Sequence, residues 1–138
     1  MQPQKLFIGG QWVEPSGGKY FKTINPATEE TIAEIAEGGP QDVDRAVAAA
    51  RKAFEAGKWS SMSASQRGKI VWKIADLLEA KVDEFAMLET LDAGKPLAES
   101  KNVEMAECID VLRYYAGFAT KITGETVPAK ANSFVYTL

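Results

Sequence analysis

The stretch Glu89-Thr90-Leu91-Asp92-Ala93-Gly94-Lys95-Pro96-Leu97 joins two predicted helices. The first helix covers about residues 82–91 and halts at Gly94, because glycine readily takes the left-handed conformation that ends a helix. Pro96 restarts the chain, since proline cannot continue a helix but suits the beginning of one. A helix of about 24 residues follows. Its inner face is marked by Met105, Ile109, Leu112 and Ala116.

Four β-favouring runs precede the helices and predict two β-hairpins. Gly9-Gly10 separates Leu6-Phe7-Ile8 from Trp12-Val13, and paired glycines tolerate the positive φ of a tight turn. The second hairpin pairs Tyr20–Ile24 with Thr31–Ala36 around an Asn-Pro turn.

Two more helices are predicted between the hairpins and the opening stretch. Residues 40–56 form an amphipathic helix that begins at Pro40, with Asp42 near the positive end of its dipole. Its apolar positions are Val43, Ala46, Val47, Ala50, Ala53 and Phe54. Ser63-Ala64-Ser65-Gln66 has the form of a capping box and opens the next helix. The stripe that this second helix is expected to bury is Ile70, Val71, Ile74, Leu77 and Leu78.

The end of the chain returns to β-structure. Residues 122–127 and 134–138 predict two strands joined by a polar connection. The second strand is still apolar where the sequence stops, so we expect the chain to be truncated. The predicted class is α/β, with amino-terminal β-hairpins, four helices and a β-arm.

Composition narrows the possible functions. The 138 residues are 46% hydrophobic and 25% charged, which is typical of a globular domain. The net charge of −3 and the lack of a basic cluster argue against a nucleic-acid or anionic-membrane surface. No apolar run is long enough for a membrane span. The chain has no histidine to act as a general base or metal ligand, and its one cysteine fits a reducing cytosol.

Motifs of nucleotide-binding and thiol enzymes are not matched. Gly94-Lys95 is not a phosphate-binding loop, because Glu89 stands where that loop needs glycine and Pro96 where it needs serine or threonine. Cys108 lies mid-helix beside Glu107 and Asp110 and lacks a cationic neighbour, so a structural thiol is favoured over a nucleophile. Glu104, Glu107 and Asp110 are most simply a solvated helix face, with a functional patch as the alternative.

Asp92 has two possible explanations from sequence. It ends a helix, where the dipole disfavours a negative charge unless a cation or donor compensates it. One explanation is a cap or a salt bridge with Lys95. The other is a hard cation bound by Asp92 together with backbone carbonyl oxygens.

Taken together, six ordered segments resemble the amino-terminal portion of the aldehyde dehydrogenase superfamily. The resemblance is strongest to the class that contains mitochondrial, retinal and betaine aldehyde dehydrogenases. The segments span nearly the whole chain: Phe7-Ile8-Gly9-Gly10-Gln11-Trp12, Thr23-Ile24-Asn25-Pro26-Ala27-Thr28-Glu29, Trp59 with Arg67-Gly68, Leu91 to Leu97, Leu112-Arg113-Tyr114-Tyr115-Ala116-Gly117, and Ile122-Thr123-Gly124-Glu125-Thr126-Val127-Pro128.

The resemblance implies a domain division and two sites. Residues 1–121 would belong to the amino-terminal part of a dinucleotide-binding domain, and residues 122–138 would start an oligomerisation arm. Several family members hold a sodium or potassium ion at the positions of Thr23, Ile24 and Asp92. The long helix lines the mouth of the substrate tunnel in related enzymes, which points to Val103 and Glu107 as substrate-access residues.

The resemblance also implies a chemistry that this chain lacks the residues to perform. In the family a cysteine attacks the aldehyde, hydride passes to NAD or NADP, and a glutamate-activated water releases the acid. The segments that carry the nucleophile, the base and the glycine-rich cofactor site are not found in this sequence, so we expect no catalytic and no cofactor-binding residues here. The expectation is the amino-terminal portion of a cytoplasmic, homo-oligomeric enzyme that assembles through the arm from Ile122. The alternative is a non-catalytic module that binds a full-length partner.

Overall fold

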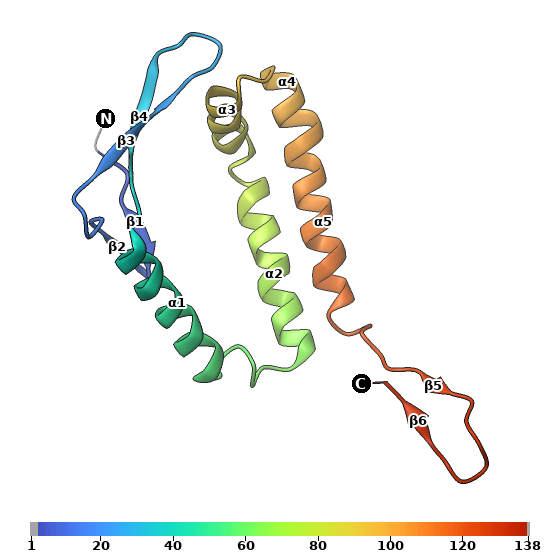
Figure 1. The fold of residues 1–138 in the computed structure, drawn as a ribbon. Coiled ribbons are helices and arrows are strands. Elements are labelled where there is room, and N and C mark those ends of the chain that lie inside the picture. The colour runs from blue at the N-terminus through green and yellow to red at the C-terminus, as the bar shows by residue number, and fades with distance from the viewer. Residues whose placement is uncertain (1–2, 138) are drawn as a thin grey trace.

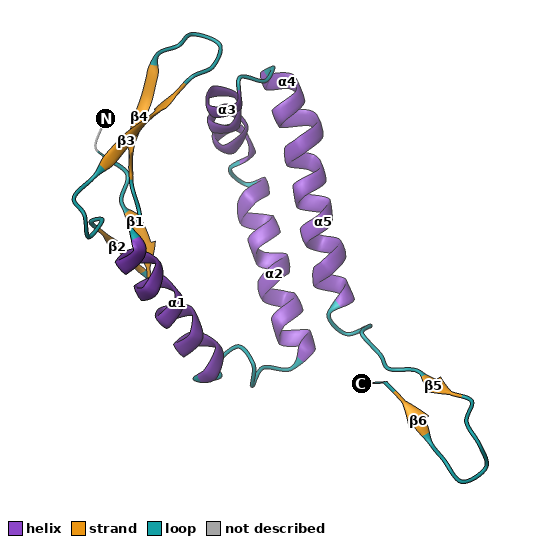
Figure 2. Cartoon of the chain, in the orientation of Figure 1, coloured by secondary structure: helices purple, strands orange, loops and turns teal. Residues whose placement is uncertain are grey.

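The computed structural model describes residues 3–137, in which two short strand pairs are followed by the helices and then by a third strand pair (Figures 1 and 2). The strands are β1 (Leu6–Ile8), β2 (Gln11–Val13), β3 (Tyr20–Ile24), β4 (Thr31–Ala36), β5 (Thr126–Val127) and β6 (Val135–Tyr136). The helices are α1 (Pro40–Glu55), α2 (Ala64–Glu79), α3 (Val82–Ala93), α4 (Leu97–Glu99) and α5 (Met105–Phe118), with a π-helical turn at Ser100–Glu104. This order confirms the predicted α/β class.

Both amino-terminal hairpins are antiparallel, as predicted. In the first, Gly9 and Gly10 have φ of 62° and 84°, and the rings of Phe7 and Trp12 lie 5.0 Å apart across the strands. The second pairs β3 with β4, and its register shifts between Thr23 and Ile24. Such a shift marks a bulge, where the hydrogen-bond ladder is interrupted.

Helix α1 is tied to the loop before β3 by a buried carboxylate. Asp42 is 3% exposed, and its oxygens accept hydrogen bonds from the Ser16 hydroxyl at 2.7 Å and the Gly39 N–H at 3.0 Å. Arg45 adds an ion pair at 2.6 Å. The bonds from Ser16 and Arg45 hold the pKa of Asp42 well below its ordinary value. Asp42 therefore has two roles: its charge lies favourably near the positive end of the helix dipole, and its hydrogen bonds fix the preceding loop.

The packed centre of the chain is the seam between α2 and α5. Small residues let the two helices approach closely, and a Cβ added at Gly68 would lie 2.6 Å from the carbonyl oxygen of Ala116. The residues buried along the two helices are Gly68, Ala75, Ile109 and Ala116. Ser63 and Gln66 form the predicted capping box at the start of α2, with Ser63 N 2.9 Å from Gln66 Oε1.

The stripe predicted to be buried on α2 was wrong in part. Ile70, Ile74 and Leu77 are 40%, 50% and 55% exposed, because α5 covers the face that carries Gly68 and Ala75. The total accessible surface is 10627 Å², whereas a compact monomer of this length exposes about 7,000 Å². The chain therefore leaves apolar helix faces uncovered.

The predicted long helix forms, but it is not regular throughout. Leu97–Glu99, the π-helical turn and α5 follow one another without a break, and Ile109 and Ala116 on the predicted inner face are each 6% exposed. The turn buries Ser100 completely, and the Thr90 hydroxyl lies 3.1 Å from the Ser100 hydroxyl. Hydrophobic spacing gave no sign of the π-helical turn.

The carboxy-terminal arm extends away from the helices (Figure 1). Strands β5 and β6 pair antiparallel but are two residues each, shorter than predicted, and Leu138 lies outside the described residues. Every described residue from Lys121 onward is exposed, with Ile122 at 77% and Phe134 at 76%. Between residues 3 and 137, no helix combines the length and the apolar character needed to cross a membrane.

Candidate functional site

The predicted cation-site residues come together where β3 meets the end of α3. The Thr23 hydroxyl lies 2.8 Å from Asp92 Oδ1, although the two residues are 69 positions apart. Ile24 follows Thr23 at the bulge. The structure therefore places all three residues at one junction.

A glycine and a proline create this junction. Gly94 ends α3 with φ of 72°, and an added Cβ would lie 2.7 Å from Cγ of Pro26. The turn at Pro26 is itself held by Asn25, whose side-chain oxygen accepts the Ala27 N–H at 2.9 Å. The end of α3 can therefore contact this turn only because residue 94 lacks a side chain.

The donor atoms at this junction suit a hard cation of low charge. Asp92 supplies one carboxylate, and within the described residues its Oδ2 accepts no hydrogen bond. The strand register shifts between Thr23 and Ile24, and the Thr23 hydroxyl beside Asp92 is a further oxygen that the sequence argument did not consider. Oxygen donors are those that hard cations prefer. Among residues 3–137, no group of three or more His, Cys, Asp or Glu side chains is arranged to hold a metal ion. A cation at this junction would therefore be neutralised by the single carboxylate of Asp92.

Lys95 does not pair with Asp92, which corrects one of the two sequence explanations. Its ammonium lies 2.9 Å from Glu89 Oε1 and 2.6 Å from Glu104 Oε1. These contacts, with Glu104 the stronger, raise the pKa of Lys95 above its ordinary value. Glu104 is therefore engaged in an ion pair rather than simply solvated, and within residues 3–137 its buried Oε2 has no hydrogen-bond partner. This cluster could not be predicted from helical spacing, because Glu89 and Glu104 lie on different helical segments and Lys95 lies between them.

The two substrate-access residues lie on the same continuous helix but in different surroundings. Val103 belongs to the π-helical turn and is 48% exposed. Glu107 is exposed on α5 and lines a hollow of about 450 Å³. The other residues that line this hollow are Glu89, Lys95, Glu104, Met105, Cys108 and Val111. Val103 lies outside that lining, so the structure does not bring the pair together in one hollow.

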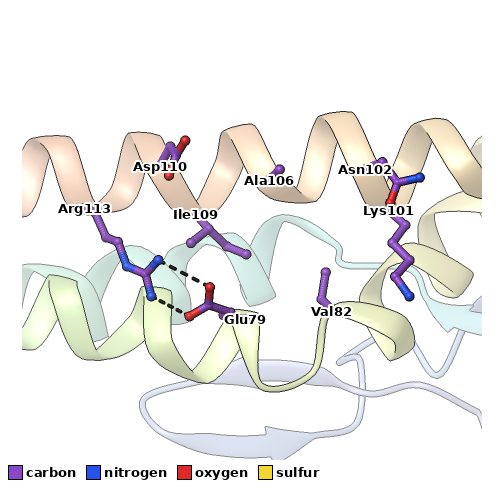
Figure 3. A pocket seen from close by; sticks show the side chains of 8 residues that line it. All are labelled: Glu79, Val82, Lys101, Asn102, Ala106, Ile109, Asp110 and Arg113. Atoms are coloured by element: carbon purple, nitrogen blue, oxygen red, sulfur yellow. Dashed lines mark hydrogen bonds and ion pairs between the residues drawn. The ribbon is translucent and has the colours of Figure 1, made fainter.

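A second hollow, of about 390 Å³, lies between α5 and the α2–α3 region (Figure 3). At one end Arg113 of α5 reaches Glu79 at 2.5 Å and Asp76 at 3.2 Å. Its guanidinium also lies 5.6 Å from the ring centre of Trp72. The pairing with Arg113 lowers the pKa of Glu79. Both carboxylates thus have a cationic partner within the chain, and the arrangement holds α5 against α2.

Comparison with known proteins identifies the family of this chain. The aldehyde dehydrogenase family profile matches residues 12–138. An aldehyde dehydrogenase of Enchytraeus buchholzi is 49% identical over 134 residues, covering 96% of this chain and 27% of that protein. A mitochondrial benzaldehyde dehydrogenase of Antirrhinum majus is 48% identical over 138 residues, covering 100% of this chain and 26% of that protein.

A solved structure shares the arrangement of the elements as well. The NAD+ complex of an aldehyde dehydrogenase from Bacillus cereus superposes with a TM-score of 0.91 at 42% identity. The match covers 98% of this chain and 28% of that one. The chain thus spans about a quarter of the length of the relatives it matches. Because the profile and the relatives cover nearly all of its residues, this chain belongs to the aldehyde dehydrogenase family.

Proposed function

We propose that this chain is the amino-terminal portion of an NAD(P)-dependent aldehyde dehydrogenase that oxidises an aldehyde to a carboxylic acid. The observation that carries the proposal is the match over 98% of the chain to an enzyme solved with NAD+. In this proposal residues 1–121 belong to the dinucleotide-binding domain and residues 122–138 begin the arm. The complete enzyme is a cytoplasmic homo-oligomer.

The chain alone is proposed to be inactive, with its NAD or NADP bound by segments that the sequence does not contain. Cys108 is its single cysteine, and the carboxylates that line the same hollow are Glu89, Glu104 and Glu107. A nucleophilic thiolate needs a cationic neighbour or a helix amino-terminus, but Lys95 in that hollow is engaged by two carboxylates.

The test of inactivity has two parts. Calorimetric titration of the 138-residue chain with NAD should show no binding, and aldehyde-dependent NADH formation should be absent with short-chain, aromatic and betaine aldehydes. Turnover that disappears in Cys108→Ser would overturn the proposal.

The junction of Thr23, Ile24 and Asp92 is proposed to bind sodium or potassium. The Asp92 carboxylate would neutralise the ion, while the carbonyl oxygens and the Thr23 hydroxyl complete part of its oxygen shell. Asp92→Asn keeps the shape but removes the charge. We expect the melting temperature of the variant to lose its dependence on potassium or sodium chloride relative to a large organic cation. Asp44→Asn, an exposed carboxylate on α1, serves as the control.

Val103 and Glu107 are proposed to lie at the substrate entrance of the complete enzyme. Because Lys95 compensates Glu104, Glu107 is the carboxylate left to act on a charged substrate. In the complete enzyme, Glu107→Gln should lower kcat/KM for a cationic aldehyde more than for a neutral one, and salt should shrink the difference. Asp110→Asn is the matched control on the same helix. An unchanged ratio at low and high salt would end this part of the proposal.

A second candidate function is a non-catalytic module that binds a full-length partner. The uncovered apolar faces and the exposed arm favour it, since 10627 Å² is a large surface for a chain of this length. Co-expression with a tagged full-length relative distinguishes the two candidates. A stable complex of fixed stoichiometry supports the module, and its absence supports the enzyme portion alone.

A further inference from the structure

The chain folds as two separately packed units that meet at two points. The first unit holds the two hairpins and α1, and the second holds the helices from α2 to α5. At one end the units are joined by residues 56–63, where Gly57 has φ of 78° (Figure 1). At the other end β3 and its turn contact the end of α3.

The contacts at this second point are few and concentrated. Among residues 3–137, the bond from Thr23 to Asp92 is the side-chain hydrogen bond that joins the two units, and no ion pair joins them. The approach of Pro26 to Gly94 lies beside it. The two units therefore depend on a small surface for their relative orientation.

The turn that carries these contacts is rigid on its own side. Lys95 lies directly after Gly94 and is held by Glu89 from α3 and by Glu104 from the π-helical turn. The hydrogen bond between Thr90 and Ser100 ties the same two segments. The segment that follows Asp92 is therefore held to both α3 and the π-helical turn by side-chain contacts.

We propose that residues 92–96 form a clasp that fixes the angle between the two units, with residues 56–63 as the hinge. When the clasp is intact, α1 keeps one orientation relative to α5. When the Thr23–Asp92 bond or the Pro26–Gly94 approach is lost, the units rotate about the hinge while each keeps its own packing. This inference goes beyond the proposed function, because it needs neither a bound cation nor catalytic activity.

The test measures the distance between α1 and α5 in the full chain. Cys108 is exposed on α5 and supplies one spin-label site, and Asp44→Cys on α1 supplies the other. Double electron–electron resonance on labelled chain diluted with excess unlabelled chain reports the distance within one molecule. The expected result is one narrow distribution for the parent protein.

Two variants open the clasp in different ways. Thr23→Val removes the hydroxyl without changing the size of the side chain, and Gly94→Ala forces a Cβ toward Pro26. Both should shift and broaden the distance distribution while circular dichroism shows unchanged helix content. Thr28→Val, in the turn that follows β3, removes a hydroxyl whose hydrogen bonds in the described part of the chain are to Glu30, and it should match the parent. Because Gly94→Ala also strains the backbone at φ of 72°, Thr23→Val decides the outcome if the glycine variant unfolds.

Two outcomes would overturn the proposal. One is a Thr23→Val distribution that superimposes on that of the parent, which would show that other contacts fix the angle. The other is a parent distribution already as broad as that of the variants, which would show that no fixed angle exists.

Discussion

Helices α1 and α2 are both 16 residues long and both amphipathic, yet within residues 3–137 it is α2 that packs closely against another helix. On α2 the buried residues are Gly68 and Ala75, and the backbone of Ala116 on α5 lies close to Gly68. Helix α1 lies beside the first hairpin, where a Cβ added at Gly9 would lie 3.7 Å from Cβ of Ala49, an ordinary contact distance. The close contact between α2 and α5 is thus made by small residues and not by the large apolar stripe of α2.

On α1, by contrast, the large apolar side chains are mostly exposed. Val43, Val47 and Phe54 share one face and are 55%, 59% and 69% exposed. A stripe of this kind normally faces a second layer of structure. Helical periodicity thus gives the direction of an apolar face but not the element that covers it.

The largest expected effect breaks the seam between α2 and α5. Ile109→Ala removes a side chain that is 6% exposed and should lower the free energy of unfolding by about 2–5 kcal/mol. Ile74→Ala makes the same chemical change at a side chain that is 50% exposed, so the loss should be about 1 kcal/mol or less. Urea denaturation followed by circular dichroism measures both. Equal losses at the two positions would contradict the assignment of the core to the small-residue face.

The next effect tests the close approach itself. Gly68→Ala places a Cβ 2.6 Å from the backbone oxygen of Ala116, and overpacking of this kind costs about 1–3 kcal/mol. Gly17→Ala is the matched control, since no atom lies within 4 Å of its added Cβ. Thermal melts of the two variants should separate clearly, and a Gly68→Ala melt equal to that of Gly17→Ala would show that the helices yield without cost.

Most of the fold could be predicted from the sequence, because its signals are local. The paired glycines, the Ser63 capping box and the helix stop at Gly94 depend on residues a few positions apart, and each is present in the structure. The π-helical turn could not be predicted from spacing, and its first residue, Ser100, is buried against Thr90, which is ten positions earlier on another helix. The exposed face of α2 was missed for a similar reason, because burial depends on the partner.

The candidate site, like the fold, has features that could be predicted before the structure was known and features that could not. Spacing alone could not bring Thr23 to Asp92 across 69 positions, and only the family resemblance did so. Neither argument identified Lys95 as the partner of Glu104. Whether a cation binds at the junction and whether Glu107 faces a substrate remain predictions.

A smaller effect is expected at Asp42, which anchors α1 to the loop before β3. Its contacts hold the pKa of Asp42 low in the folded chain, so the unfolded chain binds more protons in acid. The stability from Asp42 is fully present above about pH 4, the ordinary range of an aspartate, and is lost as the pH falls toward the folded pKa. Asp42→Asn should lower the melting temperature at neutral pH and flatten its fall in acid.

The control for this anchor is Asp44→Asn, which changes an exposed carboxylate on the same helix. It should leave the acid dependence unchanged. Glu14 and Glu79 also have lowered pKa values, so some acid dependence should persist in Asp42→Asn. An acid profile identical to that of the parent would show that α1 does not rely on this carboxylate.

The smallest effect on stability should come from removing the arm, because the arm is exposed whereas the seam between α2 and α5 is buried. Every described residue from Lys121 onward is exposed, so truncation after Lys121 removes little packing, and we expect a change of about 0.5 kcal/mol or less in the free energy of unfolding. Its effect on association should be larger, because Val127 and Val135 lie on short strands with unpaired edges that recruit other strands. Light scattering coupled to size exclusion, across a concentration series, should show association in the full chain that falls on truncation. Phe134→Ser in the full chain tests the same surface without shortening it. If the full chain runs as a sharp monomer at high concentration, the arm is not a self-association element and the exposed helix faces are tolerated in isolation.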